Sequence, residues 1–169
     1  NFERYMSDRS KENVLAQFAR DVELIERVGG ALQKMGALGT SDQDADYERL
    51  GVQLSGPAGM VHWSVGPVAK TPSGKMQLVG RRGRAALFMP ANGEPWTLEF
   101  TDGDLPQKDT QKNLQRQIHS DWDDASMAIG RFVDAVERRT TNSDWSSATR
   151  SMELAESVVS SLRKGRTID

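Results

Sequence analysis

The stretch MQLVGRRGRAALFMP, residues 76–90, contains the pattern nearest to phosphate chemistry. Backbone N–H groups of a glycine-rich turn can surround an anion, and arginine can add bidentate contacts. The dinucleotide and nucleotide patterns G-x-G-x-x-G and G-x-x-x-x-G-K-[ST] are absent from the chain. The segments on both sides of Gly80 and Gly83 have strand character. We therefore expect a turn between two strands, with Arg81 and Arg82 as solvent or interface groups.

The same arginines, together with Arg84, could in principle contact nucleic-acid phosphates. The whole chain has a net charge of −2 and an isoelectric point near 5.8, so it has no global positive field. Affinity driven by counterion release needs such a field or a strong local patch. Nucleic acid is therefore not an expected partner.

Histidine-based metal binding is not expected either. The chain has two histidines, His62 and His119, and they form no His-x-x-x-His pair. No residue is assigned to a metal. His62 precedes Trp63 in a strand-like segment and falls on the face opposite the apolar residues. We expect His62 to be exposed or to lie at an interface.

Paired carboxylates occur in SDWDDA, where Asp121, Asp123 and Asp124 could serve acid-base chemistry or hold a cation. On a helix Asp121 and Asp124 share a side while Asp123 diverges. A solvated helix face is the favoured interpretation. No catalytic residue is assigned, and no G-x-S-x-G supports a serine hydrolase.

Trp63 and Trp96, with Met60 and Met76 near them, could form an aromatic platform for sugars or bases. Each tryptophan lies at an alternating position of a strand-like segment. Large aromatic residues at such positions are more often part of a core. The sequence favours the core interpretation.

Length and composition indicate one globular domain spanning residues 1–169. The hydrophobic content of 37 % and charged content of 27 % are typical of a folded water-soluble chain. Cysteine is absent, which excludes disulfides and thiolate chemistry. No apolar run approaches the ~20 residues of a membrane span, and no leader resembles a signal peptide. The sequence does not determine the cellular compartment, and the cytoplasm is slightly favoured. The chain starts at Asn1 without a methionine, which resembles the interior of a longer chain or a mature product.

Apolar residues recur every three or four positions in three segments, which is the period of a helix. The first segment follows Ser10 and ends at Gly29, the second lies beyond Asp109, and the third runs from near Ser143 to Gly165. The three apolar stripes are Val14, Phe18, Val22, Ile25 and Val28; then Leu114, Ile118, Trp122, Ala125, Ile129, Phe132 or Val133, and Val136; then Ala148, Met152, Ala155, Val159 and Leu162.

Between the first two helices the apolar period changes to two, as in a sheet with one buried face. The expected strands lie in ALQKMGALGT, RLGVQLS, GMVHWSVG, KMQLVG, RAALFM and PWTLEF, and SDQDADYE is an acidic loop. Short turns between strands favour antiparallel neighbours. The order of elements predicts an α+β fold, with a largely antiparallel open sheet of about five or six strands and helices packed on one face.

This order of segments resembles the C-terminal domain of the Gfo/Idh/MocA family of nicotinamide-dependent sugar and inositol oxidoreductases. The end of the chain, residues 131–169, is similar to the family's F-x-x-A-I helix and the following helix that closes in S-x-x-x-G-R-x-V; here the closing is SLRKGRTID. LGVQLSGPAGMVHWSVGP resembles a strand pair of the family, and MQLVGRRGRAALF resembles its I-x-G-x-x-G-x-I hairpin. ARDVELIERVGGALQKMGALG looks like the helix and strand that open the domain.

The resemblance implies a substrate-binding and oligomerisation domain whose open sheet face packs on a second copy. It implies that NAD or NADP binds an N-terminal Rossmann domain, which also carries the family's Glu-Lys-Pro lysine. Within this chain no cofactor residue is therefore expected. The implied partners are that Rossmann domain and further copies of the chain, with neither nucleic acid nor membrane.

The opening helix departs from the family pattern D-x-x-x-H-x-x-D, in which Asp and His assist the lysine in proton transfer. With the last Asp placed at Asp21, Phe18 stands at the His position and Val14 at the first Asp position. Asp21 alone matches and is a candidate substrate-facing residue. Val14 and Phe18 fit the apolar stripe of the helix.

The expected function is thus that of a substrate and oligomerisation domain of an oxidoreductase acting on a sugar, inositol or related polyol. Such a domain is not catalytic alone. The alternative is a free-standing, non-enzymatic binding or assembly module with the same fold. His62, Arg81 and Arg82 are the interface candidates under either hypothesis.

Overall fold

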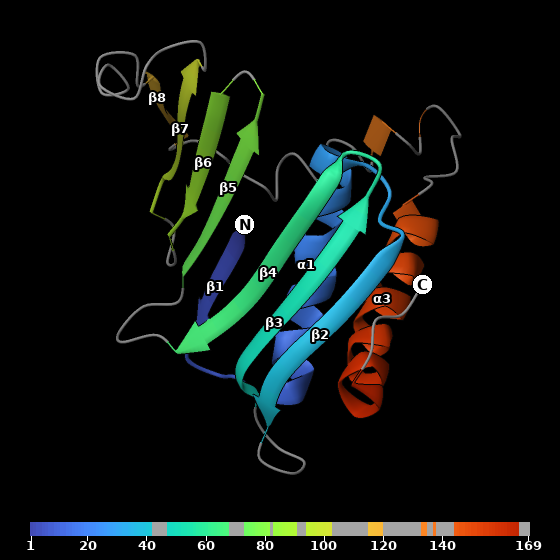
Figure 1. The fold of residues 1–169 in the computed structure, drawn as a ribbon. Coiled ribbons are helices and arrows are strands. Elements are labelled where there is room, and N and C mark those ends of the chain that lie inside the picture. Colours follow the sequence, from blue (N-terminus) through green and yellow to red (C-terminus); the bar gives the residue numbers. More distant parts are fainter. Residues whose placement is uncertain are drawn as a thin grey trace.

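The computed structural model describes residues 1–41, 47–67, 73–81, 83–90, 94–102, 115–119, 133–134, 137 and 144–165. Within them, eight strands form one mixed sheet, and two long helices, α1 (Lys11–Gly29) and α3 (Asp144–Lys164), pack on one of its faces (Figure 1). In sheet order the strands are β2 (Lys34–Ser41), β3 (Tyr47–Gly56), β4 (Gly59–Pro67), β1 (Phe2–Met6), β5 (Ser73–Gly80), β6 (Gly83–Met89), β7 (Trp96–Asp102) and β8 (Gln115–His119). The predicted α+β class, with its largely antiparallel open sheet, is confirmed.

The first strand of the chain lies in the middle of the sheet. β1 runs parallel to β4 and antiparallel to β5, and all other neighbouring strands are antiparallel. Helix α1 follows β1 and covers the back of the sheet before the chain enters the meander from β2 to β4 (Figure 1). β1 therefore joins two antiparallel groups of strands, β2–β4 and β5–β8.

Two strands lie outside the sequence-based expectation of five or six. β1 was not predicted because Arg4 occupies an inward position of FERYM and breaks the expected apolar alternation. β8 contains a single aliphatic residue, Ile118, and lies at the edge of the sheet. The prediction that Ile118 belongs to a helical stripe was therefore wrong. Val133, Asp134 and Glu137 are helical, whereas most of that predicted helix lies outside the described residues.

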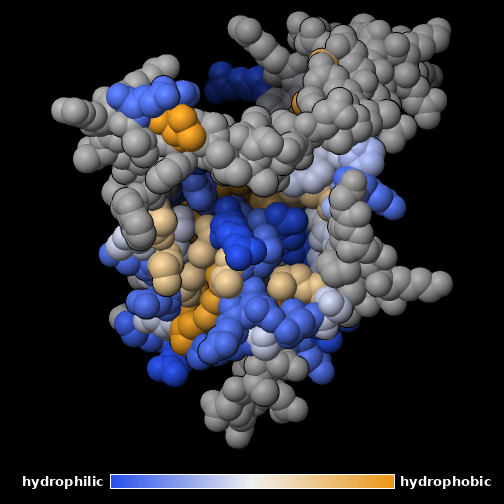
Figure 2. Space-filling view, turned by 180° about the vertical axis from the view of Figure 1, so that it is seen from behind, coloured by the Kyte–Doolittle hydropathy of each residue, from blue (hydrophilic) through white to orange (hydrophobic). Residues whose placement is uncertain are grey.

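The core fills the space between the helices and the sheet. Phe18 and Trp63 meet edge to face, with ring centroids 5.0 Å apart and planes at 74°, a geometry that aromatic pairs prefer. Around them lie buried apolar side chains from α1, β1, β3, β4 and α3, including Phe2, Val14, Val22, Ile25, Leu50, Val52, Leu54 and Val158. The side of the molecule seen from behind is mostly hydrophilic, with a narrower hydrophobic strip (Figure 2).

The predicted apolar stripe of α1 is confirmed except at its end, where Val28 is 51 % exposed. The predicted face of α3 is confirmed at Ala155, which is buried, and at Leu162, which is partly buried against the core, and it is wrong at Ala148 and Met152, which are exposed. Met152 is 65 % exposed, and the buried positions are Ser151, Ala155, Val158 and Ser161. Two serines on the inward side lower the hydrophobicity of the face that is actually buried. None of the described helices has the length and apolar character that a membrane span needs.

Ser161 explains why a polar residue lies on the inward face of α3. The backbone N–H of Ala37 in β2 donates to Ser161 Oγ at 3.0 Å, in a buried position. Among the described strands β2 lies at the edge of the sheet, so half of its backbone groups have no neighbouring strand there. The serine hydroxyl thus satisfies an edge N–H group that the helix covers.

We expect Ser161→Ala to lower the free energy of unfolding by about 1–3 kcal/mol, because it leaves the buried N–H of Ala37 without its acceptor. The matched control is Ser151→Ala on the same helix. Ser151 Oγ is also buried but has no hydrogen-bond partner among the described residues, so its removal should be neutral or slightly stabilising. Urea denaturation of both variants measures the difference, and equal losses would contradict this account of Ser161.

Candidate functional site

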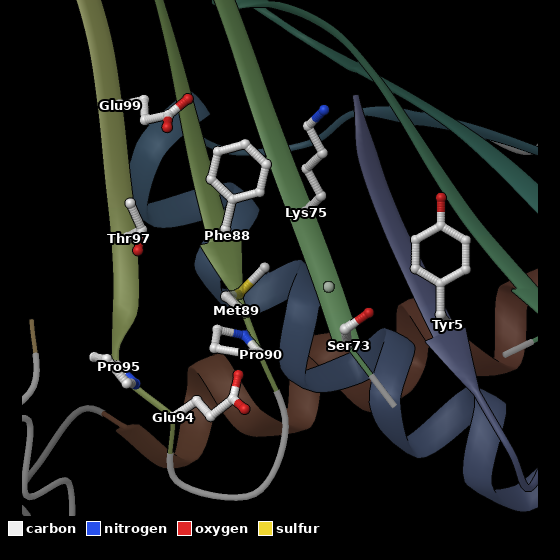
Figure 3. Close-up of a pocket in the computed structure, with 11 residues that line it drawn as sticks. Tyr5, Ser73, Lys75, Phe88, Met89, Pro90, Glu94, Pro95, Thr97 and Glu99 are labelled. Atoms are coloured by element: carbon white, nitrogen blue, oxygen red, sulfur yellow. The ribbon is translucent and has the colours of Figure 1, made fainter. Parts of the chain in front are cut away.

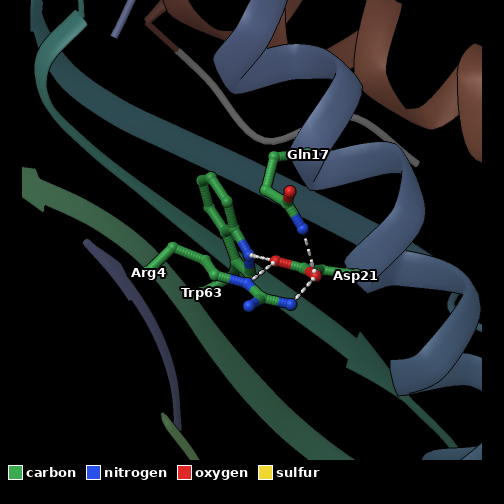
Figure 4. Close-up of polar contacts among 4 residues, drawn as sticks. All are labelled: Arg4, Gln17, Asp21 and Trp63. Atoms are coloured by element: carbon green, nitrogen blue, oxygen red, sulfur yellow. Dashed lines mark hydrogen bonds and ion pairs between the residues drawn. The ribbon is translucent and has the colours of Figure 1, made fainter. Parts of the chain in front are cut away.

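A buried carboxylate connects α1 to the centre of the sheet. Asp21 is 2 % exposed, and its two oxygens accept hydrogen bonds from three side chains (Figure 4). Arg4 donates from Nε to Oδ2 at 2.7 Å and from Nη2 to Oδ1 at 2.5 Å. Trp63 Nε1 donates to Oδ2 at 2.8 Å, and Gln17 Nε2 donates to Oδ1 at 2.9 Å. The carboxylate is therefore saturated by donors from β1, β4 and its own helix.

The two hydrogen bonds to Asp21 hold the Arg4 guanidinium in one orientation. Its guanidinium carbon also lies 4.8 Å from the centroid of the Phe2 ring, within the range of a cation–π contact. Gly74 stands opposite Arg4 on β5, and a Cβ atom there would collide with Nη1. The guanidinium side chain is 17 % exposed. The ion pair thus fixes Arg4 in a partly exposed position.

A hollow of about 290 Å³ opens beside Arg4. We call it the Arg4 hollow; its wall comes from the end of β1, the first turns of α1 and the start of β5. Polar lining groups are the side chains of Arg4, Ser7, Asp8, Asn13, Gln17 and Ser73. Met6, Met89, Pro90 and Trp96 supply the apolar part. Such a mixture suits a small ligand with several hydroxyl groups.

A second, larger hollow of about 640 Å³ lies on the sheet face opposite the helices (Figure 3). We call it the Lys75 hollow. It shares Tyr5, Ser73, Met89 and Pro90 with the Arg4 hollow, so the two adjoin at the end of β1. Lys75 Nζ lies 5.2 Å from the centroid of the Phe88 ring. Tyr5, Lys75, Phe88, Thr97 and Glu99 stand on neighbouring strands and point to the same side (Figure 3).

Two ionisable groups of these walls have shifted pKa values. Tyr5 Oη donates a hydrogen bond to Glu3 Oε2 at 2.9 Å. This hydrogen bond and the negative charge of Glu3 both raise the pKa of the Tyr5 phenol. The backbone N–H of Ser10 donates to Asp8 Oδ1 at 2.9 Å and is the main cause of a lowered pKa at Asp8. At neutral pH the Arg4 hollow therefore has a protonated Tyr5 and a charged Asp8 at its rim.

The GRRG segment is a hairpin turn, as predicted. Gly80 and Gly83 pair at the ends of β5 and β6, and Gly83 adopts φ 155°. Arg81 and Arg84 are exposed, and Arg82 lies outside the described residues. His62 is exposed on β4 opposite Gln53, on the face away from the helices. The roles proposed for His62, Arg81 and Arg82 at an interface stay predictions.

The carboxylate cluster at Asp121, Asp123 and Asp124 lies outside the described residues, and of His119 only the backbone is described. No group of three or more His, Asp or Glu side chains within the described ranges could hold a metal ion. Trp63 belongs to the core, as expected, and Trp96 is partly buried against it.

Asp21 lies behind Arg4 and Gln17, which form part of the Arg4 hollow. Its candidate role toward a substrate stays a prediction. Any such role would be indirect, because Asp21 would act by holding the Arg4 and Gln17 side chains in place. Sequence reasoning missed Arg4. A signal was present, because Asp21 falls within the apolar stripe of α1, and a buried carboxylate requires a cationic or N–H partner. The position of that partner in β1 could not be read from local periodicity.

Comparisons with known proteins identify relatives of this fold. Neither protein-family models nor curated protein sequences match the chain. Among solved structures, a dehydrogenase from Clostridium difficile matches with a TM-score of 0.72 at 12 % identity, over 96 % of this chain and 54 % of that one. UDP-N-acetylglucosamine 3-dehydrogenase from Acidithiobacillus ferrooxidans matches with a TM-score of 0.70 at 13 % identity, over 95 % and 53 %. The fold is that of the C-terminal domain of Gfo/Idh/MocA-type oxidoreductases.

The same fold occurs in aldose-aldose oxidoreductase from Caulobacter crescentus, with a TM-score of 0.67 at 10 % identity, over 90 % of this chain and 45 % of that one. The chain therefore spans about half the length of the solved structures that it matches. At such low identity the likeness concerns the Gfo/Idh/MocA-type fold and leaves the chemistry to be argued from the side chains.

Proposed function

We propose that this chain is the substrate-binding and oligomerisation domain of a nicotinamide-dependent oxidoreductase acting on a sugar, inositol or related polyol. The observation that carries the proposal is a structural match. Nearly the whole chain superposes on about half the length of each of two enzymes, which are named as a UDP-sugar dehydrogenase and an aldose oxidoreductase. NAD or NADP would bind a Rossmann domain ahead of Asn1. This domain alone would not transfer hydride.

The two adjoining hollows support a substrate role. Hydroxyl groups need fixed donors and acceptors at close range, and the Arg4 hollow is lined by the Arg4 guanidinium, the Asn13 amide, the Ser73 hydroxyl and the Asp8 carboxylate. Asp21 would serve as a positioning residue that holds Arg4 in place. Tyr5 and Phe88 in the Lys75 hollow add flat apolar surfaces of the kind that sugar rings contact.

The coding sequence ahead of Asn1 is the first check. The proposal expects at least ~120 residues there, with a strand followed by G-x-G-x-x-G/A. A start codon directly ahead of Asn1 would contradict it and favour the free-standing module.

In the full-length protein, we expect Ser73→Ala to raise the KM for the polyol substrate about five- to tenfold, the effect of removing one hydrogen bond. Turnover is followed by absorbance of the reduced nicotinamide, with myo-inositol, glucose and UDP-N-acetylglucosamine as probes. Ser64→Ala is the matched control, since Ser64 lies on β4 and lines neither hollow. A Ser73→Ala enzyme with KM unchanged for every accepted probe would exclude the Arg4 hollow as the substrate site.

The oligomerisation role rests on the sheet face opposite the helices. Leu38 on β2 is 81 % exposed there, with Met60 on β4 and Tyr5 on β1 also exposed. Exposed apolar residues gathered on one sheet face are typical of a surface that packs on a partner. We propose a second copy of the chain as that partner, with His62 within the contact.

Light scattering at tens of micromolar should therefore find a dimer or a larger species. Leu38→Glu should shift the equilibrium toward monomer, because it places a charge in the apolar contact. Met152→Glu on the outer side of α3 introduces the same charge at a similarly exposed residue and should leave the species unchanged. A monomeric unmodified chain, or equal effects of both variants, would contradict the proposal.

A further inference from the structure

Two carboxylates set the hydrogen-bonding character of the Arg4 hollow. Asp21 is buried behind its wall, and Asp8 lines it just ahead of α1. An ionised carboxylate only accepts hydrogen bonds, so each of these groups attracts the donor end of a neighbouring amide side chain. The amides concerned are those of Asn13 and Gln17, which lie one helical turn apart on α1 and both line the hollow.

The carboxylates engage the nitrogen atoms of both amides. Gln17 Nε2 donates to Asp21 Oδ1 at 2.9 Å, and Asn13 Nδ2 donates to Asp8 Oδ2. Each amide oxygen is therefore the end of the group that no carboxylate engages. Figure 4 shows the oxygen of Gln17 turned away from its contact with Asp21. These two side chains thus contribute acceptor oxygens, Oδ1 of Asn13 and Oε1 of Gln17, to the wall of the hollow.

The ionised groups at the hollow leave a negative charge. Arg4 Nη2 lies 2.5 Å from Asp21 Oδ1, so the cation of Arg4 is neutralised by an anion behind it. The backbone N–H of Ser10 holds the pKa of Asp8 below its usual range, and Asp8 is charged at neutral pH. Tyr5 is protonated there, because its pKa is raised. Among the lining residues that the structure describes, Asp8 is therefore the charge without an oppositely charged partner.

We propose that the Arg4 hollow binds a sugar that carries a primary ammonium group, with this group beside Asp8 and Asn13. The assignment rests on the proposed function and names its substrate class, an amino sugar. An ammonium group has three donors and a compact positive charge, which complement a carboxylate and amide oxygens. Because Asp8 and Asn13 are in direct contact, one ammonium group can reach both. Gln17 Oε1, one turn further along α1, then accepts from a hydroxyl group of the ring.

The same wall disfavours an acidic sugar. A carboxylate or phosphate group placed beside Asp8 meets a like charge and acceptor oxygens, and neither can donate to it. The guanidinium of Arg4 offers little compensation, because its charge is paired with Asp21. The hollow should therefore rank sugars by charge, with cationic sugars first, neutral sugars second and anionic sugars last.

Binding of three matched sugars to the full-length protein tests this order. Glucosamine, glucose and glucuronate share one ring and differ in charge, and a titration at about pH 6.5 keeps the amine protonated. By calorimetry we expect glucosamine to bind about fivefold more tightly than glucose, and glucuronate to bind more weakly than glucose. Because Asp8 is exposed, the preference for glucosamine should shrink between ~50 and ~500 mM salt.

Asp8→Asn removes the charge and keeps the size of the side chain, so it should lower the preference for glucosamine over glucose to about twofold or less. Glu12→Gln is the matched control. It removes one negative charge from the first turn of α1 at a residue that lines neither hollow, and it should leave the preference unchanged. Urea denaturation checks that both variants are folded, and the comparison of the three sugars on the unmodified protein does not depend on either variant.

Glucose or glucuronate binding as tightly as glucosamine would overturn the amino-sugar assignment and leave the proposed sugar-binding role intact. Equal loss of the preference in Asp8→Asn and Glu12→Gln would also overturn it, because the preference would then come from the overall charge of the surface. If none of the three sugars binds, both the proposed function and the assignment are contradicted.

Discussion

The carboxylate of Asp21 is the constraint on which the rest of the structure depends. It lies in the core and would be strongly unfavourable there without its donors. Those donors are Arg4 on β1 and Trp63 on β4, which are neighbouring strands, with Gln17 from the same helix. One side chain therefore fixes how α1 lies across the centre of the sheet. It also sets the position of Arg4, and with it the shape of the Arg4 hollow.

This dependence explains how far the sequence could predict the fold. The two antiparallel groups β2–β4 and β5–β7 follow from period-two alternation and glycine-rich turns, and α1 follows from its apolar stripe and its flanking residues. The central strand did not follow, because Arg4 at an inward position resembles a surface residue until its partner on α1 is known. The orientation of α3 did not follow either, since Ser161 is buried in order to satisfy Ala37 of an edge strand. Both failures involve polar residues whose partners are distant in the sequence.

The two hollows differ in their chemistry. The polar Arg4 hollow and the mixed Lys75 hollow adjoin at one end of β1. The sequence predicts few functional residues in this region.

A double-mutant cycle on Arg4 and Asp21 tests the central claim most directly. The account predicts that Arg4→Met and Asp21→Asn each lower the free energy of unfolding by about 3–5 kcal/mol, because Arg4→Met leaves the buried Asp21 carboxylate without its cation and Asp21→Asn leaves the partly buried Arg4 without its anion. The double variant should lose clearly less than the sum, with a coupling of about 2 kcal/mol or more. The exposed pair Glu23 and Arg27 on the same helix is the control, with an expected coupling of at most about 0.5 kcal/mol. Additive effects at Arg4 and Asp21 would contradict the account.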